Sequence, residues 1–167
     1  MTLANYAVAF LDLQGQTERL SRYSLVPDIE KPDETLIQWI RSTFGLVTHF
    51  RSAFRDYLAS SKSHRYAVPQ LKDFLFDDIK IDAVSDSIIL YTSLYDTPDR
   101  IPLHDLHTMI GACGSLFLLF LSEGVPFRGG MDIGVGMELE EIGFYGSAIS
   151  KAYYLESKVA NYTHAQN

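Results

Sequence analysis

Short apolar runs alternate with longer amphipathic stretches along the first half of the chain. Residues 6–13, YAVAFLDL, form an apolar run rich in strand-favouring residues, and Gly15 follows its end, so the run predicts the first strand. The stretch 32–61 has acidic residues in its first turn and apolar residues at helical spacing, which predicts one long amphipathic helix. Its apolar positions are Leu36, Ile40, Phe44, Val47, Phe54 and Leu58.

The next stretch of alternating residues predicts a hairpin. Residues 74–94 alternate between apolar and polar groups, with turn-forming residues near 83–85. Two strands joined by a tight turn satisfy this pattern, and the tip of the hairpin falls just before Asp86. A helix is then expected from about Leu103 to Ser122, ending at Gly124.

The last part of the chain predicts one more strand and one more helix. Apolar groups alternate with other residues along the stretch that follows Gly124, as in a strand, and they are Met131, Ile133, Val135, Met137 and Leu139. The stretch 143–146 is expected to turn the chain into a helix that begins near Tyr145. The element order is therefore β-α-β-β-α-β-α, which favours an α+β fold with a ferredoxin-like β-α-β-β-α-β core and helices on one face of a mainly antiparallel sheet.

Composition and charge narrow the class of protein. The chain has 167 residues, 47% of them hydrophobic and 21% charged, which is typical of a single globular domain over 1–167. Its net charge of −7 argues against a general nucleic-acid binder, because phosphate backbones are held by clustered Lys and Arg. The single Cys113 and the lack of a signal-peptide pattern at the N-terminus indicate a cytoplasmic protein, and the apolar run 108–121 is shorter than a membrane span of about 20 residues.

Two aspartates stand at the ends of predicted strands. Asp12 closes the first strand and Asp86 follows the hairpin tip. In a ferredoxin-like sheet these ends meet at one edge, and two close carboxylates favour a divalent cation between them, with a nucleoside triphosphate as a suitable further ligand. The turn after Asp12, LQGQTE at 13–18, has a glycine that frees backbone N–H groups for phosphate oxygens. The alternative is that both aspartates are ordinary turn and cap residues.

Four motifs resemble one family when they are taken together. AFLDLQGQT, VSDSIIL, FRGGMDIGVG and FYGSAISKAYYLES occur in the order and at roughly the spacing of the class III nucleotidyl cyclase catalytic domain. The sequence is most similar to the bacterial pyrimidine cyclases, which make uridylate or cytidylate cyclic nucleotides, of Pycsar anti-phage systems. The resemblance covers the chain from Tyr6 to Ala160.

The resemblance implies an activity and its cofactors. It implies a homodimer with active sites between protomers, two Mg²⁺ or Mn²⁺ ions, and conversion of a nucleoside triphosphate to a 3′,5′-cyclic monophosphate and pyrophosphate. The product would signal to a separate cyclic-nucleotide-responsive effector in phage defence. By position, Asp12 and Asp86 correspond to the metal-binding aspartates and the Leu13 carbonyl to a further ligand, while Gly15, Gln16 and Thr17 form the turn beside the phosphates.

The chain departs from the purine cyclases where those enzymes read the base. Four positions before the second metal aspartate they have a Lys, where this chain has Asp82. Three positions before the glycine at the helix entrance they have an Asp or similar residue, where this chain has Gly143. Neither adenine-reading group is present, which favours UTP or CTP over ATP.

A second departure concerns the residues that act on the ribose and the α-phosphate. Purine cyclases have an Asn and, four residues later, an Arg on the helix after this glycine, where this chain has Ser150 and Tyr154. Tyr154 lacks the cationic fork of Arg, so Arg128 in FRGG is a candidate substitute. The alternative for Arg128 is a solvated strand end or an ion pair with Glu123 or Glu141.

Two other functions compete with an active cyclase. The family has a further strand after the last helix, and KVANYTHAQN at 158–167 offers none, so a truncated, catalytically weak or inactive domain that dimerises or binds a nucleotide is the alternative. Diguanylate cyclases share the ferredoxin-like core, but their hairpin has a Gly-Gly-(Asp/Glu)-Glu-Phe sequence where this chain has AVSDS.

Overall fold

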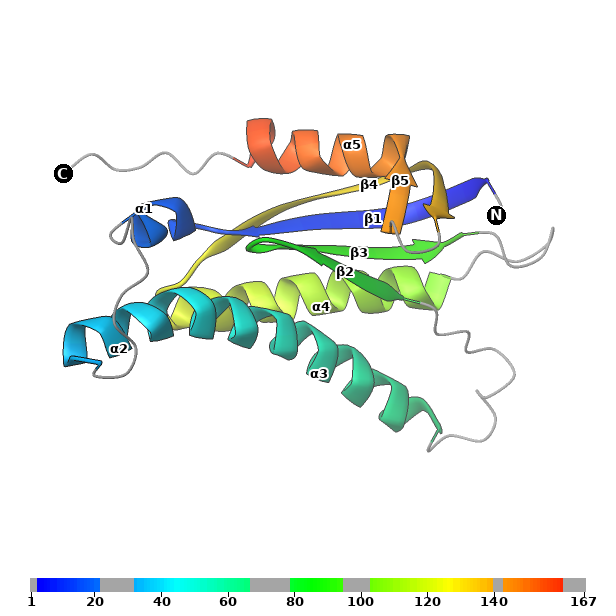
Figure 1. The fold of residues 1–167 in the computed structure, drawn as a ribbon. Helices are drawn as coiled ribbons and strands as arrows, with labels where there is room; N and C mark the ends of the chain where they lie inside the picture. The colour runs from blue at the N-terminus through cyan, green and yellow to red at the C-terminus, as the bar shows by residue number, and fades with distance from the viewer. Residues whose placement is uncertain (1–2, 22–31, 67–78, 95–102, 140–142, 161–167) are drawn as a thin grey trace.

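The protein forms a five-stranded antiparallel sheet with helices on both faces (Figure 1). This computed structural model describes residues 3–21, 32–66, 79–94, 103–139 and 143–160. The strand order is β2-β3-β1-β4-β5. The strands are β1 (Ala4–Leu13), β2 (Lys80–Val84), β3 (Ser87–Ser93), β4 (Phe127–Leu139) and β5 (Gly143–Gly146). The first four strands have the order of the ferredoxin-like core, which confirms the predicted fold class.

The helices fall into two layers. They are α1 (Gln16–Leu20), α2 (Glu34–Ile40), α3 (Leu46–Tyr66), α4 (Leu103–Ser122) and α5 (Ser147–Tyr154). The two helices of the core, α3 and α4, lie on one face of the sheet as expected, and α5 lies on the opposite face (Figure 1). The larger core lies between the sheet and α3 and α4, while a smaller cluster, including Val8 and Phe144, packs against α5.

The structure confirms the long helix predicted at 32–61, but this helix contains a π turn. The segment η1 (Arg41–Gly45) joins α2 to α3 with one turn of π-helix. A π turn adds a residue to the helical repeat and so rotates the faces that follow it. Leu36, Phe54 and Leu58 are buried as predicted, whereas Phe44 is 58% exposed and Phe50, which was not among the expected core positions, is fully buried.

Helix α4 is the central helix of the larger core. Its bounds agree with the sequence prediction, and Gly124 follows its end with a φ of 71°. Met109, Ala112 and Phe120 on its inner face are fully buried. By length and composition, this is the one helix among the described residues that has the dimensions of a membrane span, a property that core helices of globular proteins share.

The stretch 143–146 is a strand and not the turn that the sequence predicted. It forms β5, which pairs antiparallel with the end of β4, so that Gly146 lies opposite Gly136. A strand with glycine at both ends lacks the branched side chains that mark strands in a sequence. Helix α5 begins directly after it, at Ser147.

Candidate functional site

The two predicted metal aspartates meet at one end of the sheet. In the β1–β3 register Asp12 lies opposite Ser87, and Asp86 is the residue before Ser87 at the tip of the β2–β3 hairpin. The two carboxylates are close enough for the charge of Asp86 to raise the pKa of Asp12. The hairpin and the sheet order therefore bring together two residues that lie far apart in the sequence.

Each oxygen of the Asp12 carboxylate faces a different group. The Ser87 hydroxyl donates a hydrogen bond to Oδ1 over 2.7 Å, and a guanidinium nitrogen of Arg128 lies 3.9 Å from Oδ2. The pKa of Asp12 is raised from its ordinary value, mainly because burial disfavours the charged form, and Ser87 and Arg128 oppose that rise. An ionised Asp12 is thus a partly buried anion, which a nearby cation would stabilise.

Arg128 is tied to a carboxylate that the sequence prediction did not consider. Its Nε donates to Oε1 of Glu156, in the π turn η3 (Leu155–Val159) that ends α5. The side chain of Glu156 is only 2% exposed, and burial raises its pKa while Arg128 opposes that rise. The alternatives of a free Arg128, or of one paired with Glu123, are wrong, because the guanidinium bonds Glu156. The alternative partner Glu141 lies outside the described residues.

The turn after β1 has the backbone that its glycine predicts. Gly15, which precedes α1, has a φ of 79°. This is a left-handed backbone conformation, which favours glycine. Leu13 is buried and lies opposite Phe127 in β4, and Thr17 is exposed on α1. The side chain of Gln16 is buried, and neither of its polar atoms has a partner among the described residues.

Ser150 and Tyr154 lie on the outer side of α5. Both are exposed, Tyr154 by 60%, while Ala148 and Ala152 on the opposite side of the helix are fully buried. The hydroxyl of Ser150 donates to the carbonyl of Gly146, the residue that precedes its helix. The two side chains therefore face away from the sheet that carries Asp12.

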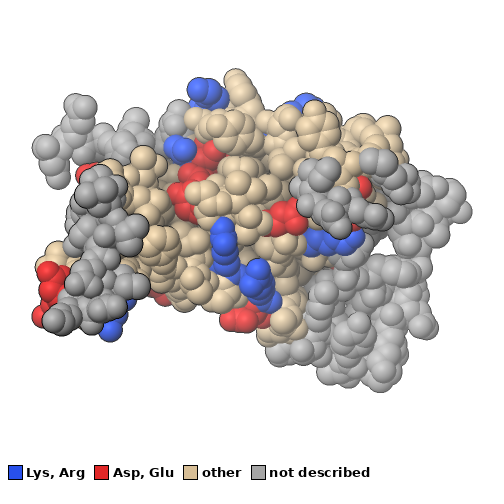
Figure 2. Space-filling view, in the orientation of Figure 1, with Lys and Arg blue, Asp and Glu red and all other residues tan. Residues whose placement is uncertain are grey.

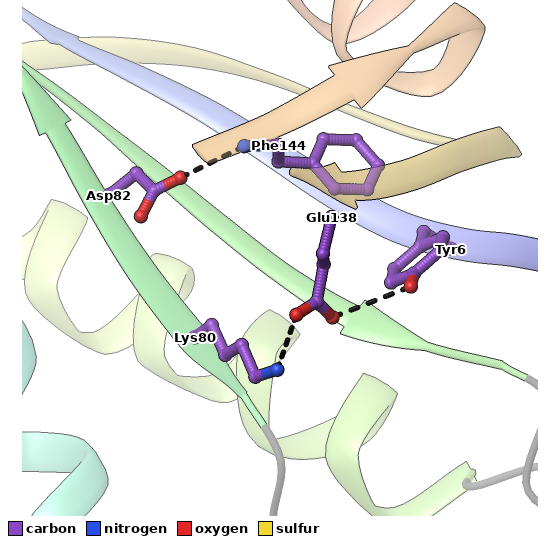
Figure 3. A network of polar contacts seen from close by, with 5 residues as sticks. All are labelled: Tyr6, Lys80, Asp82, Glu138 and Phe144. Carbon is purple, nitrogen blue, oxygen red and sulfur yellow. Dashed lines mark hydrogen bonds and ion pairs between the residues drawn. The ribbon is translucent and has the colours of Figure 1, made fainter. Parts of the chain in front are cut away.

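The two positions that the resemblance matches to the purine-reading residues, 82 and 143, lie next to each other. The Asp82 carboxylate on β2 accepts a hydrogen bond of 3.2 Å from the backbone N–H of Phe144 on β5 (Figure 3). A Cβ at Gly143 would stand 2.7 Å from the same carboxylate, and the φ of Gly143 is 95°. Asp82 is therefore engaged within its own chain, and position 143 has no room beside it for a side chain.

A second polar group lies next to this contact (Figure 3). Lys80 forms an ion pair of 2.5 Å with Glu138, and the Tyr6 hydroxyl lies 3.4 Å from the same carboxylate. Tyr91, whose ring stacks on that of Phe144, has a pKa above its ordinary value, mainly because of burial and also because of the charges of Asp82 and Glu138. Sequence reasoning missed this group, because alternation in β2 and β4 gives no sign of which polar residues share a face.

The donors at the end of β1 suit a hard divalent cation. Among the described residues, no group of three or more His, Cys, Asp or Glu side chains is arranged to hold a metal ion. Asp12 and Asp86 together supply carboxylate oxygens, and Mg²⁺ is commonly held by one or two carboxylates, with water and phosphate oxygens in its other positions. These residues fit a cation that a phosphate-bearing ligand also binds.

Charged side chains are scattered over the face of the molecule that Figure 2 shows. Acidic and basic groups alternate there between wide uncharged areas, and the described residues form no continuous basic stripe on this face (Figure 2). This distribution agrees with the net charge of −7.

Comparison with known proteins gives a likeness at the level of the fold. The structure is similar to that of the adenylyl cyclase CyaB from P. aeruginosa, with a TM-score of 0.50 and 16% sequence identity. The similarity covers 93% of this chain and 72% of the CyaB chain. No family model matches the chain, and no curated protein matches it. The chain therefore has the nucleotidyl cyclase fold, as the sequence motifs predicted.

Proposed function

We propose that this protein is a nucleotidyl cyclase that converts a nucleoside triphosphate to a 3′,5′-cyclic monophosphate and pyrophosphate. The observation that carries the proposal is the meeting of Asp12 and Asp86 at the end of β1, in a fold similar to that of an adenylyl cyclase. The resemblance of the sequence motifs to class III cyclases supports the same activity.

The chain contributes the ligands for two Mg²⁺ or Mn²⁺ ions. Asp12 and Asp86 would hold them, with the Leu13 carbonyl as a further ligand, and the turn at Gly15, Gln16 and Thr17 would lie beside the phosphates. The ions, when bound, supply the charge that makes the ribose 3′-hydroxyl a better nucleophile and stabilises the leaving pyrophosphate. Ser87 fixes one oxygen of Asp12 and so orients this carboxylate before any ligand arrives.

The complete site would need two copies of the chain. Ser150 and Tyr154 occupy the positions of the ribose- and phosphate-binding residues of purine cyclases, and both face outward from their own sheet. A homodimer with active sites between protomers lets these exposed side chains of one protomer act at the aspartates of its partner. The hydroxyl groups of Ser150 and Tyr154 would then donate hydrogen bonds to the substrate.

A pyrimidine nucleotide is the substrate that we favour. The position of the purine-reading Lys is held by Asp82, which bonds the N–H of Phe144, and position 143 is a glycine with no room for a side chain beside Asp82. Neither group that reads adenine in the purine cyclases is therefore available. The similarity of the motifs to the pyrimidine cyclases of Pycsar systems favours UTP or CTP and a role in anti-phage signalling, in the cytoplasm, through a separate effector.

The alternative is a domain that binds a nucleotide or dimerises without turnover. Two observations favour it. Tyr154 supplies no positive charge for the α-phosphate, and Arg128, the candidate substitute, already pairs with the buried Glu156. Under this alternative the aspartates still bind the metal–nucleotide complex, but no cyclic product forms.

Incubation with each of the four ribonucleoside triphosphates and Mn²⁺, followed by mass spectrometry of the products, tests the proposal. We expect a cyclic pyrimidine nucleotide from the wild-type chain and none from Asp12→Asn or Asp86→Asn. Asp56→Asn, on the exposed side of α3, is the matched control and should retain full activity. Nucleotide binding without any cyclic product would support the inactive domain, and activity that survives in both aspartate variants would exclude the two-aspartate site.

A further inference from the structure

Arg128 lies between two carboxylates but contacts them unequally. Its Nε bonds Oε1 of Glu156 directly, while its Nη2 remains 3.9 Å from Oδ2 of Asp12, at the outer limit of an ion pair. In the β1–β4 register Arg128 lies directly opposite Asp12, so the strands alone would permit a closer contact. Glu156, at the end of α5, holds the guanidinium away from Asp12.

Glu156 is able to hold Arg128 because it is itself fixed. Its side chain is 2% exposed. A buried carboxylate without a partner strongly destabilises the folded state, so the fold favours keeping Glu156 paired with Arg128. The backbone around it is also confined, because a Cβ at Gly130 on β4 would stand 2.2 Å from the Ala152 carbonyl and 2.8 Å from the Glu156 nitrogen. The last turn of α5 thus lies directly on β4 and keeps Glu156 beside Arg128.

The position of Arg128 decides what remains open at Asp12. Oδ1 accepts the hydrogen bond from Ser87, which leaves Oδ2 as the oxygen that faces Arg128. A guanidinium that moved closer would pair with Oδ2 and compete with any other cation for it. Held by Glu156, Arg128 still offsets part of the negative charge of Asp12, but Oδ2 stays accessible.

We propose that Glu156 is a positioning residue for the metal site: it retains Arg128 and so keeps Oδ2 of Asp12 free for a divalent cation. The inference rests on the proposed function, because it concerns the same aspartate. It predicts that Glu156, though it contacts no ligand, sets the affinity of the chain for Mn²⁺. It also predicts that the effect depends on the presence of Arg128.

Mn²⁺ titration of the full chain, with free Mn²⁺ measured by electron paramagnetic resonance, tests this without any turnover. Glu156→Gln releases Arg128 toward Asp12, so Mn²⁺ should bind about fivefold more weakly, the change that a cation competitor worth about 1 kcal/mol produces. In Arg128→Met/Glu156→Gln the competitor is absent, so the affinity should return at least to the wild-type value. Melting temperatures of the same variants report separately on folding.

The control separates positioning from the general effect of charge. Asp132 lies on the same face of β4 and pairs with Lys151 over 3.9 Å, and no described contact joins it to Arg128. Asp132→Asn removes one negative charge from β4, as Glu156→Gln removes one from η3. We expect less than a twofold change in Mn²⁺ affinity for the control. Equal weakening in both variants would show that only the net charge matters and would overturn the inference.

Two further results would also decide against it. An unchanged affinity in Glu156→Gln, with Mn²⁺ binding lost in Asp12→Asn, would leave the metal site intact and make the Arg128–Glu156 pair purely structural. Unaltered Mn²⁺ binding in Asp12→Asn would instead overturn the metal site of the proposed function, and the inference with it. If Glu156→Gln unfolds below the assay temperature, the test is made with Arg128→Met/Glu156→Gln, which lacks both charges. An Mn²⁺ affinity at or above that of the wild type supports the inference, and weaker Mn²⁺ binding overturns it.

Discussion

The guanidinium of Arg51 on α3 donates a hydrogen bond to the carbonyl of Ser85, at the tip of the β2–β3 hairpin. Ser85 precedes Asp86, so a helix of the larger core holds the turn that carries one of the two site aspartates. Arg51→Met removes this bond, and we expect the free energy of unfolding to fall by about 1 kcal/mol, as for a partly solvated charged hydrogen bond. Urea denaturation measures the change. Arg55→Met, one turn further along α3 and exposed, should cost much less, and an equal loss in both variants would contradict the role of Arg51.

Ser85 itself has a backbone conformation that favours glycine. Its φ is 55°, and it is the one non-glycine residue with positive φ in the described part of the chain. Ser85→Gly removes a steric cost of about 1 kcal/mol or more but makes the unfolded chain more flexible, so we expect a net gain of about 0.5 kcal/mol in the free energy of unfolding. Thermal denaturation beside Ser85→Ala, which keeps the Cβ, tests it. A gain of the same size in Ser85→Ala would mean that the backbone conformation is not the cause.

The close contact between α5 and β4 requires glycine at position 130. A methyl group there would meet the backbone of Ala152 and Glu156 and the Cβ of Leu155 at 2.2 to 2.8 Å, so Gly130→Ala should lower the free energy of unfolding by about 3 kcal/mol. Gly114→Ala on the exposed side of α4 meets nothing within 4 Å and should raise it by about 1 kcal/mol, because alanine favours helix. Denaturation midpoints that move in the same direction for both variants would contradict this packing.

Cys113 should be an unreactive thiol in the folded protein. Burial on α4 raises its pKa from 9.0 to about 12, so at pH 8 the reactive thiolate is about a thousandfold scarcer than in an exposed cysteine. The unfolded chain ionises this thiol at a lower pH than the folded protein does, so the free energy of unfolding falls as the pH rises from about 9 toward 12. The rate of modification by a thiol reagent, measured at pH 8 with and without urea, tests the expectation. Equal rates in the two conditions would mean that the thiol is accessible in the fold.

Most of the fold could be predicted from the sequence, because strongly periodic segments determine it. The bounds of α4 and the tip of the β2–β3 hairpin agree with the prediction, since apolar spacing and turn residues mark them locally. Residues 143–146 were predicted as a turn and form a strand, and the buried Phe50 was not among the predicted apolar positions. Glycine at both ends hides the strand β5, and the π turn before α3 shifts the buried face in a way that no regular period reveals.

The candidate site was predicted in part for a similar reason. The meeting of Asp12 and Asp86 follows from the topology alone, because a ferredoxin-like sheet sets the first strand beside the strand after the hairpin. Their partners Ser87 and Glu156 were missed. Ser87 could have been found from the strand register, but Glu156 bonds Arg128 across 28 positions of sequence, and the closeness of α5 to β4 is visible only in three dimensions.

Two glycines of β4, Gly130 against α5 and Gly136 against the Phe144 ring, also have a consequence for how the sequence can vary. Gly130 and Gly136 admit no larger side chain without moving Ala152 or Phe144, although neither glycine lies among the polar residues of the site. In a saturation mutagenesis library selected for folded protein, these two positions should therefore be among the most restricted in the chain. The exposed positions of α5, Ser150 and Tyr154 among them, should accept many residues in the same selection, and lose that freedom only when the selection is for what the protein does.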